Sequence, residues 1–133
     1  MGSNVQKTVL AKLETLVMKE VWKRGRATVH EVRDALDEKR NLAYTTILTT
    51  LRNLEKKGFL EHELEGRSHV YTPKIDEKTV EASSISNLLY SLFDGSKVKL
   101  VQALFEAEPL TKEEYEDLKQ AILDRKKRES RHE

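Results

Sequence analysis

The fold of this chain is decided by residues 42–73, LAYTTILTTLRNLEKKGFLEHELEGRSHVYTP. Apolar side chains recur at helical spacing over residues 43–57, which predicts one helix with Gly58 just beyond its end. Two short segments follow, residues 60–64 and 69–72, on either side of Glu65-Gly66-Arg67-Ser68. These segments predict a β-hairpin with an arginine at its tip. A helix followed by a basic-tipped hairpin is the layout of a winged-helix domain.

The polar side of the predicted helix is rich in threonine, at Thr45, Thr46 and Thr49, beside Arg52 and Asn53. Threonine is a mediocre helix former because its branched Cβ restricts χ1. This surface therefore indicates selection for contacts rather than for helix stability. Hydroxyls, methyls and a guanidinium suit the base edges and phosphates of DNA. The alternative is an ordinary solvated helix face, and the hairpin that follows favours DNA.

The candidate DNA-binding residues come from three segments of the sequence. The first turn of the predicted helix would point into the major groove, and Arg67 would reach a phosphate or the adjacent minor groove. A solvated turn arginine is the alternative for Arg67. Thr28 precedes another predicted helix, whose N-terminus suits a phosphate. The complete set is Thr28, Ala43, Tyr44, Thr45, Thr46, Thr49, Arg52, Asn53 and Arg67.

Two further helices are predicted before this stretch. The first runs from about residue 9 to residue 24 and ends at Gly25. Thr28-Val-His-Glu31 reads as a capping box that opens the second helix, to about residue 39. The apolar face of the second helix is expected to bury Val29, Val32, Ala35 and Leu36. Residues 1–75 are thus predicted to form a winged-helix DNA-binding domain.

Helical periodicity returns after Pro73, with helices predicted from Asp76 to about residue 93, over residues 97–106 and from Thr111 to about residue 127. Three short helices cannot enclose their own apolar stripes, so a second copy of the chain is the expected partner. Residues 76–133 are thus predicted to form a three-helix dimerisation domain. Its expected interface residues are Leu88, Leu89, Leu92, Val101, Leu104, Phe105, Leu118 and Ile122. The predicted fold class is mainly α with a small β-hairpin wing.

The composition and the distribution of charge limit the classes of function that the chain can have. The 133 residues carry a net charge of +1 and no cysteine, which excludes disulfides and thiolate metal sites. The charge is divided unevenly, because residues 1–75 have a balance of +4 and residues 76–133 a balance of −3. The basic charge therefore lies with the helix and the hairpin. The chain has no long apolar run and no signal-peptide core, so a cytoplasmic protein is expected.

No motif indicates catalysis. The four histidines, His30, His62, His69 and His132, show no metal-ligand spacing, and the carboxylates are scattered among lysines as on a solvated surface. Gly-rich phosphate loops, Ser/His/Asp arrangements and zinc-protease motifs are not found. The sequence predicts a protein that is not an enzyme and that uses neither a cofactor nor a metal.

The chain resembles the penicillinase-repressor family of bacterial transcription regulators in four groups of residues. The motifs are Leu13-Glu-x-Leu-Val-Met18 with Val21-Trp22, Leu42-Ala-Tyr-Thr-Thr-Ile47 with Leu51-x-x-Leu54, Lys57-Gly58, and Gly66-Arg67 with Tyr71-x-Pro73. The resemblance spans about residues 13–127 and implies a homodimeric winged-helix repressor with an inverted-repeat operator. It also implies that the recognition-helix positions and Arg67 face DNA. Many members have arginine at the position of Asn53.

The resemblance also bears on induction. One branch of the family is inactivated when a membrane metalloprotease sensor cuts the dimerisation region, and the matching stretch here is Ala103, Leu104 and Phe105. The asparagine that usually precedes the cut is absent from this chain. The copper-responsive branch carries C-terminal cysteines, which this chain lacks.

The residues together with this resemblance therefore predict a dimeric repressor that binds double-stranded DNA and blocks transcription, and the resemblance implies β-lactam-resistance or related genes as its targets. Two alternatives stay open at this point. One is a winged-helix module that binds protein instead of DNA, which the near-neutral charge and the glutamates at residues 61, 63 and 65 favour. The other is a regulator that senses a small molecule in an apolar pocket between the halves.

Overall fold

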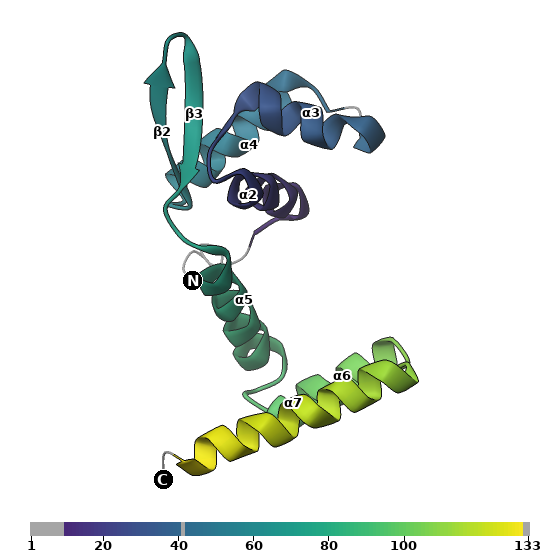
Figure 1. Ribbon diagram of the computed structural model, residues 1–133. Coiled ribbons are helices and arrows are strands. Elements are labelled where there is room, and N and C mark those ends of the chain that lie inside the picture. The colour runs from purple at the N-terminus through teal and green to yellow at the C-terminus, as the bar shows by residue number, and fades with distance from the viewer. Residues whose placement is uncertain (1–9, 41, 132–133) are drawn as a thin grey trace. The chain divides into compact units, whose positions relative to one another are not determined.

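The computed structural model describes residues 10–40 and 42–131 (Figure 1). Its elements confirm the predicted class, a mainly helical fold with one small antiparallel sheet. In chain order they are α2 (Lys12–Arg24), β1 (Ala27–Thr28), α3 (Val29–Arg40), α4 (Tyr44–Lys56), β2 (Leu60–Glu65), β3 (Ser68–Pro73), α5 (Glu77–Leu92), α6 (Lys97–Ala107) and α7 (Lys112–Arg131). The elements divide into two compact units between Leu88 and Leu89. The predicted domain boundary after residue 75 stays a prediction.

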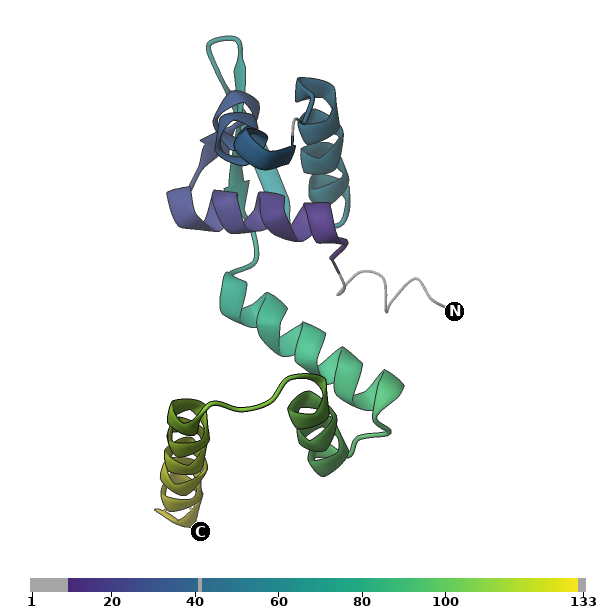
Figure 2. The ribbon, with the colours of Figure 1, turned by 90° about the vertical axis from the view of Figure 1, so that its right-hand side faces the viewer.

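The core of the first unit lies where α2, α3 and α4 pack on one another and on the sheet (Figure 2). Its side chains are buried and almost wholly apolar, as the helical periodicity predicts. They are Val17, Met18, Val21, Ala27, Val29, Val32, Leu36, Ile47, Leu51, Leu54, Phe59, Leu60, Tyr71 and Val80. The prediction that Ala35 is buried is wrong, because Ala35 is exposed. Val29, Val32 and Leu36 define the inner face of α3, and Ala35 falls about 90° to one side of it.

The sheet has the strand order β1-β3-β2, with both pairings antiparallel. Strand β2 runs against β3 from Leu60 opposite Pro73 to Glu65 opposite Ser68, which confirms the predicted hairpin and extends each strand by one residue into the turn, so that two residues remain between them. Gly66 opens this turn at φ 63°, a left-handed conformation that glycine adopts without a Cβ clash. Strand β1 was not predicted, because two residues are too short to show an alternating pattern.

The end of α4 is shaped by a Schellman motif. Gly58 has φ 90°, its N–H donates to the carbonyl of Glu55, and the N–H of Phe59 donates to the carbonyl of Leu54 at 2.9 Å. Leu54 and Phe59 are both buried in the core. The predicted stop at Gly58 is confirmed, and the motif turns the chain directly from the helix into β2.

The start of α5 belongs to the first unit. The indole N–H of Trp22 donates to the carbonyl of Ile75 at 2.9 Å, and Val80 is buried in the core. Asp76 caps α5, because its carboxylate accepts from the N–H of Thr79 at 2.9 Å, as expected for an N-cap aspartate. These contacts hold the first turns of α5 against α2.

The second unit contains the end of α5 with α6 and α7. Ser96 caps α6, and Thr111 forms a reciprocal capping box with Glu114 at the start of α7. Neither α6 nor α7 contributes a buried residue. Across residues 10–40 and 42–131, no helix is both long enough and apolar enough to cross a membrane.

Candidate DNA interface

Helix α4 has the two sides that its sequence predicts. Ile47, Leu51 and Leu54 have no exposed surface, and they hold the helix against the core. The other side is exposed and carries the predicted contact residues Ala43, Thr45, Thr46, Thr49, Arg52 and Asn53. Thr50 is buried instead, and its hydroxyl donates to the carbonyl of Thr46 at 2.8 Å. That bond satisfies the hydroxyl within the helix and leaves three outward-facing threonines.

Three of the predicted segments converge on one hollow of about 310 Å³. The start of α3, one side of α4 and the tip of the hairpin form its walls. The residues that line it are Thr28, Val29, His30, Tyr44, Leu48, Arg52, Arg67, Ser68 and His69. Four predicted residues, Thr28, Tyr44, Arg52 and Arg67, therefore share a site although 39 positions separate the first from the last. The remaining predicted residues lie on α4 outside the hollow.

Thr28 enters the hollow as the N-cap of α3. Its hydroxyl accepts from the N–H of Glu31 at 3.1 Å, and the Glu31 carboxylate accepts from the N–H of Thr28 at 2.8 Å. The predicted capping box is therefore confirmed. Hydrogen bonding from Thr28 holds the pKa of Glu31 below its usual value, aided by Arg24 and Arg26. Because the Thr28 hydroxyl serves as acceptor within the cap, its proton is available to a phosphate.

Two arginines supply free positive charge on this surface. Arg52 and Arg67 are exposed, and neither has an ion-pair partner within the described part of the chain. Arg26, in contrast, is paired with Glu65 at the end of β2. This pair neutralises one of the three hairpin glutamates that would repel phosphate. Glu61 and Glu63 remain exposed on the same strand.

Histidines contribute to the interface more than the sequence indicates. The His30 ring lies 4.7 Å from that of Tyr44, and His69 lines the hollow beside Arg67. His62 stacks on His69 at 4.8 Å, and its Nδ1 lies 2.7 Å from a carboxylate oxygen of Glu55. His62 thereby links the hairpin to the end of α4. The sequence places His62 and His69 in the two predicted strands but carries no signal that their rings stack.

Tyr71 closes the base of the hairpin from the core side. Its ring lies 5.5 Å from that of His62, and the side chain is 1% exposed. Burial raises the pKa of Tyr71, and the Glu55 carboxylate adds to this effect. The residue therefore acts as a neutral packing group that supports the hairpin from the core side.

The predicted dimerisation residues are mostly exposed within the single chain. Leu92 and Ile122 are each 66% exposed, and Leu89 differs from the others because it is only 7% exposed. The exposed members of the set are Leu88, Leu92, Val101, Leu104, Phe105, Leu118 and Ile122. Ala103, Leu104 and Phe105, the stretch that matches the cleavage region, lie within α6. Their predicted roles stay predictions.

Three packed helices, a short sheet and a hairpin whose arginine lies beside an exposed threonine-bearing helix define a winged-helix DNA-binding protein. Comparison with known proteins is more specific. Residues 10–124 match the penicillinase repressor family. The chain belongs to this family of transcriptional repressors.

Individual relatives agree with this assignment. The penicillinase repressor of Bacillus licheniformis is 34% identical over 119 residues, which cover 90% of this chain and 93% of that protein. The transcriptional regulator BlaI of Mycobacterium tuberculosis is 42% identical over 67 residues, 50% of this chain and 49% of that protein. Among solved structures, the Staphylococcus aureus transcription regulator MepR aligns with a TM-score of 0.52 at 20% identity, over 91% of this chain and 81% of that one. The likeness to MepR concerns the fold alone.

Proposed function

We propose that this protein is a homodimeric repressor that binds an inverted-repeat operator through α4 and the β2–β3 hairpin, and that it blocks transcription by covering a promoter. The observation that carries this proposal is the hollow in which α3, α4 and the hairpin tip meet, with Arg52 and Arg67 at its walls and no ion pair to either of them among residues 10–40 and 42–131. Unpaired guanidinium groups on a concave surface suit the phosphates that flank a groove of DNA.

Each segment has a distinct role in the proposed complex. The N-terminal turn of α4 enters the major groove, where Thr45, Thr46 and Thr49 contact base edges and thymine methyl groups. Ala43 permits close approach, and Asn53 lies farther along the same exposed side. Arg52 pairs with guanine or a phosphate.

The remaining contacts of the proposed complex surround the hollow. Thr28 donates its hydroxyl proton to a phosphate at the N-terminus of α3, where the helix dipole also favours an anion. Tyr44 packs beside the backbone against His30. Arg67 reaches the next phosphate or the minor groove. Because its target is chromosomal DNA, the protein acts in the cytoplasm.

Dimerisation is supported by the second unit. Large apolar side chains along α6 and α7 are exposed, and neither helix buries a residue within the single chain. Monomeric proteins seldom leave apolar helix faces of this extent in water. A second copy covers them symmetrically, and it brings two α4 helices to two half-sites about one helical turn apart.

The regulated genes follow from the relatives by analogy. The Bacillus licheniformis relative is named a penicillinase repressor, and it is similar to this chain over nearly its whole length. We therefore propose β-lactam-resistance or related genes as the targets.

A fluorescence-anisotropy titration tests this proposal. Duplexes tiled from the DNA upstream of the protein's own gene are titrated near physiological salt, with a scrambled duplex as competitor. We expect nanomolar binding to one tile, with two chains per duplex. Weak binding that is uniform across the tiles and disappears as salt is added would show a non-specific electrostatic interaction and contradict operator recognition.

A further inference from the structure

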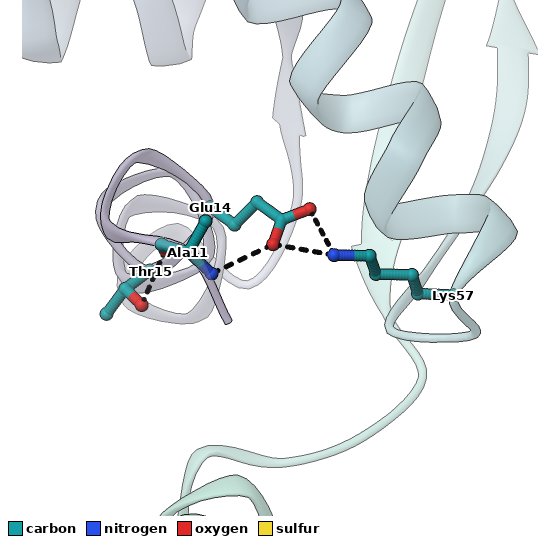
Figure 3. Close-up of polar contacts among 4 residues, drawn as sticks. All are labelled: Ala11, Glu14, Thr15 and Lys57. Atoms are coloured by element: carbon teal, nitrogen blue, oxygen red, sulfur yellow. Dashed lines mark hydrogen bonds and ion pairs between the residues drawn. The ribbon is translucent and has the colours of Figure 1, made fainter. Parts of the chain in front are cut away.

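One ion pair of the first unit has a buried carboxylate and a partly exposed ammonium, and neither residue lines the hollow of the proposed DNA surface. Glu14 of α2 is 7% exposed, and both its carboxylate oxygens lie 2.8 Å from Nζ of Lys57 (Figure 3). The same carboxylate accepts from the N–H of Ala11 at 3.0 Å, as the N3 residue of the α2 cap. The side chain of Lys57 is 35% exposed, so only the carboxylate is withdrawn from water.

The pair joins two helix ends. Glu14 lies in the first turn of α2, and Lys57 is the C-cap residue of α4. Both charges complement the helix dipoles, since an anion is favoured at an N-terminus and a cation at a C-terminus. The contact therefore joins the start of α2 to the C-terminal end of α4. The N-terminal end of α4 is the part that is proposed to read DNA.

We propose that the Glu14–Lys57 pair positions α4 for base readout, so that Glu14 and Lys57 determine operator specificity without touching DNA. This inference rests on the proposed role of α4 as the recognition helix. Apolar packing of Ile47, Leu51 and Leu54 holds α4 on the core but is non-directional. The ion pair acts at one point instead: two short charge-assisted contacts join the ammonium at the C-cap of α4 to a carboxylate that the Ala11 N–H also holds, and they constrain where the C-terminal end of α4 lies along α2.

A small change in the orientation of α4 at its C-terminal end produces a larger displacement at its N-terminal end. Thr45 is separated from Lys57 by about 18 Å of helix, at about 1.5 Å per residue. A tilt of about 5° about the C-terminal end therefore moves the first turn of α4 by about 1.5 Å over that length. A displacement of this size is enough to break a hydrogen bond between a side chain of α4 and a base edge.

The test compares this pair with a matched pair on the same helix. Lys19 of α2 and Glu77 of α5 form an ion pair at 3.1 Å, but both side chains are largely exposed and neither lies on α4. Glu14→Gln keeps an acceptor for the Ala11 N–H, and Lys57→Met keeps the aliphatic stem. These two variants and their double variant are compared with Lys19→Met, Glu77→Gln and that double variant, all in the full chain.

Two affinities are measured for each variant: for the duplex that the wild-type protein selects from a random pool, and for a scrambled duplex. We expect Glu14→Gln and Lys57→Met each to weaken binding to the selected duplex about tenfold, comparable to the loss of one good base contact, with little change for the scrambled duplex. Glu14→Gln is the sharper case, because it makes the protein more positive and simple electrostatics predicts tighter binding. We expect the Lys19 and Glu77 variants to match wild type.

The outcomes separate positioning from stability. If both affinities fall together, or if only the melting temperature falls, the pair merely stabilises the fold and the proposal is wrong. If the wild-type protein selects no duplex, the proposed function fails instead. Residual dipolar couplings of backbone amides then decide the positioning role: we expect α4 to reorient relative to α2 in Glu14→Gln and in Lys57→Met but not in the control variants, and an unchanged α4 would overturn the inference.

Discussion

Ile122→Ala tests the proposed dimer at a position where most of the side chain is exposed in the single chain. Ile122 lies in α7 and is 66% exposed, and α7 has no buried residue. Alanine is the best helix former, so the substitution leaves the helix intact. Most of any loss of free energy should therefore come from the exposed part of the Ile122 side chain that a second copy would bury.

The magnitude follows from the exposed fraction. Complete burial of an isoleucine side chain contributes about 1.5–3 kcal/mol, so about two-thirds of that remains available to a dimer. Alanine retains part of this, which leaves about 1–1.5 kcal/mol per chain. A two-fold interface counts the change twice, and about 2–3 kcal/mol corresponds to a dimer Kd about 30- to 150-fold weaker.

Sedimentation equilibrium over a range of protein concentrations measures this Kd, and circular dichroism checks that the helical content is unchanged. Asp117→Ala is the matched control, because Asp117 is exposed on the same helix about 140° around its axis from Ile122. We expect the control to dimerise like wild type. A dimer Kd for Ile122→Ala within twofold of wild type would refute the reasoning, as would an equal loss in Asp117→Ala.

Four further predictions concern the first unit. Arg67→Ala should weaken binding to all duplexes and make the salt dependence of the affinity shallower by about one ion, and an effect confined to particular base pairs would contradict a phosphate contact. Glu31→Gln should lower the melting temperature at neutral pH, because the folded-state pKa of Glu31 is below its ordinary value. The stabilisation from the Glu31 carboxylate is present above its unfolded-state pKa and is lost as pH falls through its folded-state pKa. The melting temperatures of variant and wild type should therefore converge in acid, and a difference that stays constant with pH would contradict the capping role. Gly66→Ala should destabilise the fold by about 1 kcal/mol through backbone strain alone, since a Cβ there meets no atom within 4 Å, and denaturant unfolding that matches wild type would contradict this. Leu51→Ala should cost about 2–5 kcal/mol in the same assay, because the side chain has no exposed surface, and a loss below 1 kcal/mol would show that the core closes around the cavity.

The sequence by itself determined the helices, the hairpin and their order along the chain. Apolar spacing, capping boxes at Thr28 and Thr111, and glycines after α2 and α4 are local signals, because each depends on residues within a few positions of one another. The hairpin turn at Gly66 and the polar side of α4 were predicted for the same reason. The family resemblance added the expected roles of these residues.

Only the tertiary structure decided which distant residues meet. The hollow between α3, α4 and the hairpin, the Arg26–Glu65 pair and the Glu14–Lys57 pair each join residues more than 15 positions apart, and helical or strand periodicity carries no information on such pairings. Strand β1 exists because β3 offers a free edge for Ala27 and Thr28, not because two residues favour a strand. The wrong prediction for Ala35 has a different reason: Ala35 lies beside the face of α3 that packs on the core, so an apolar residue type alone did not decide its burial.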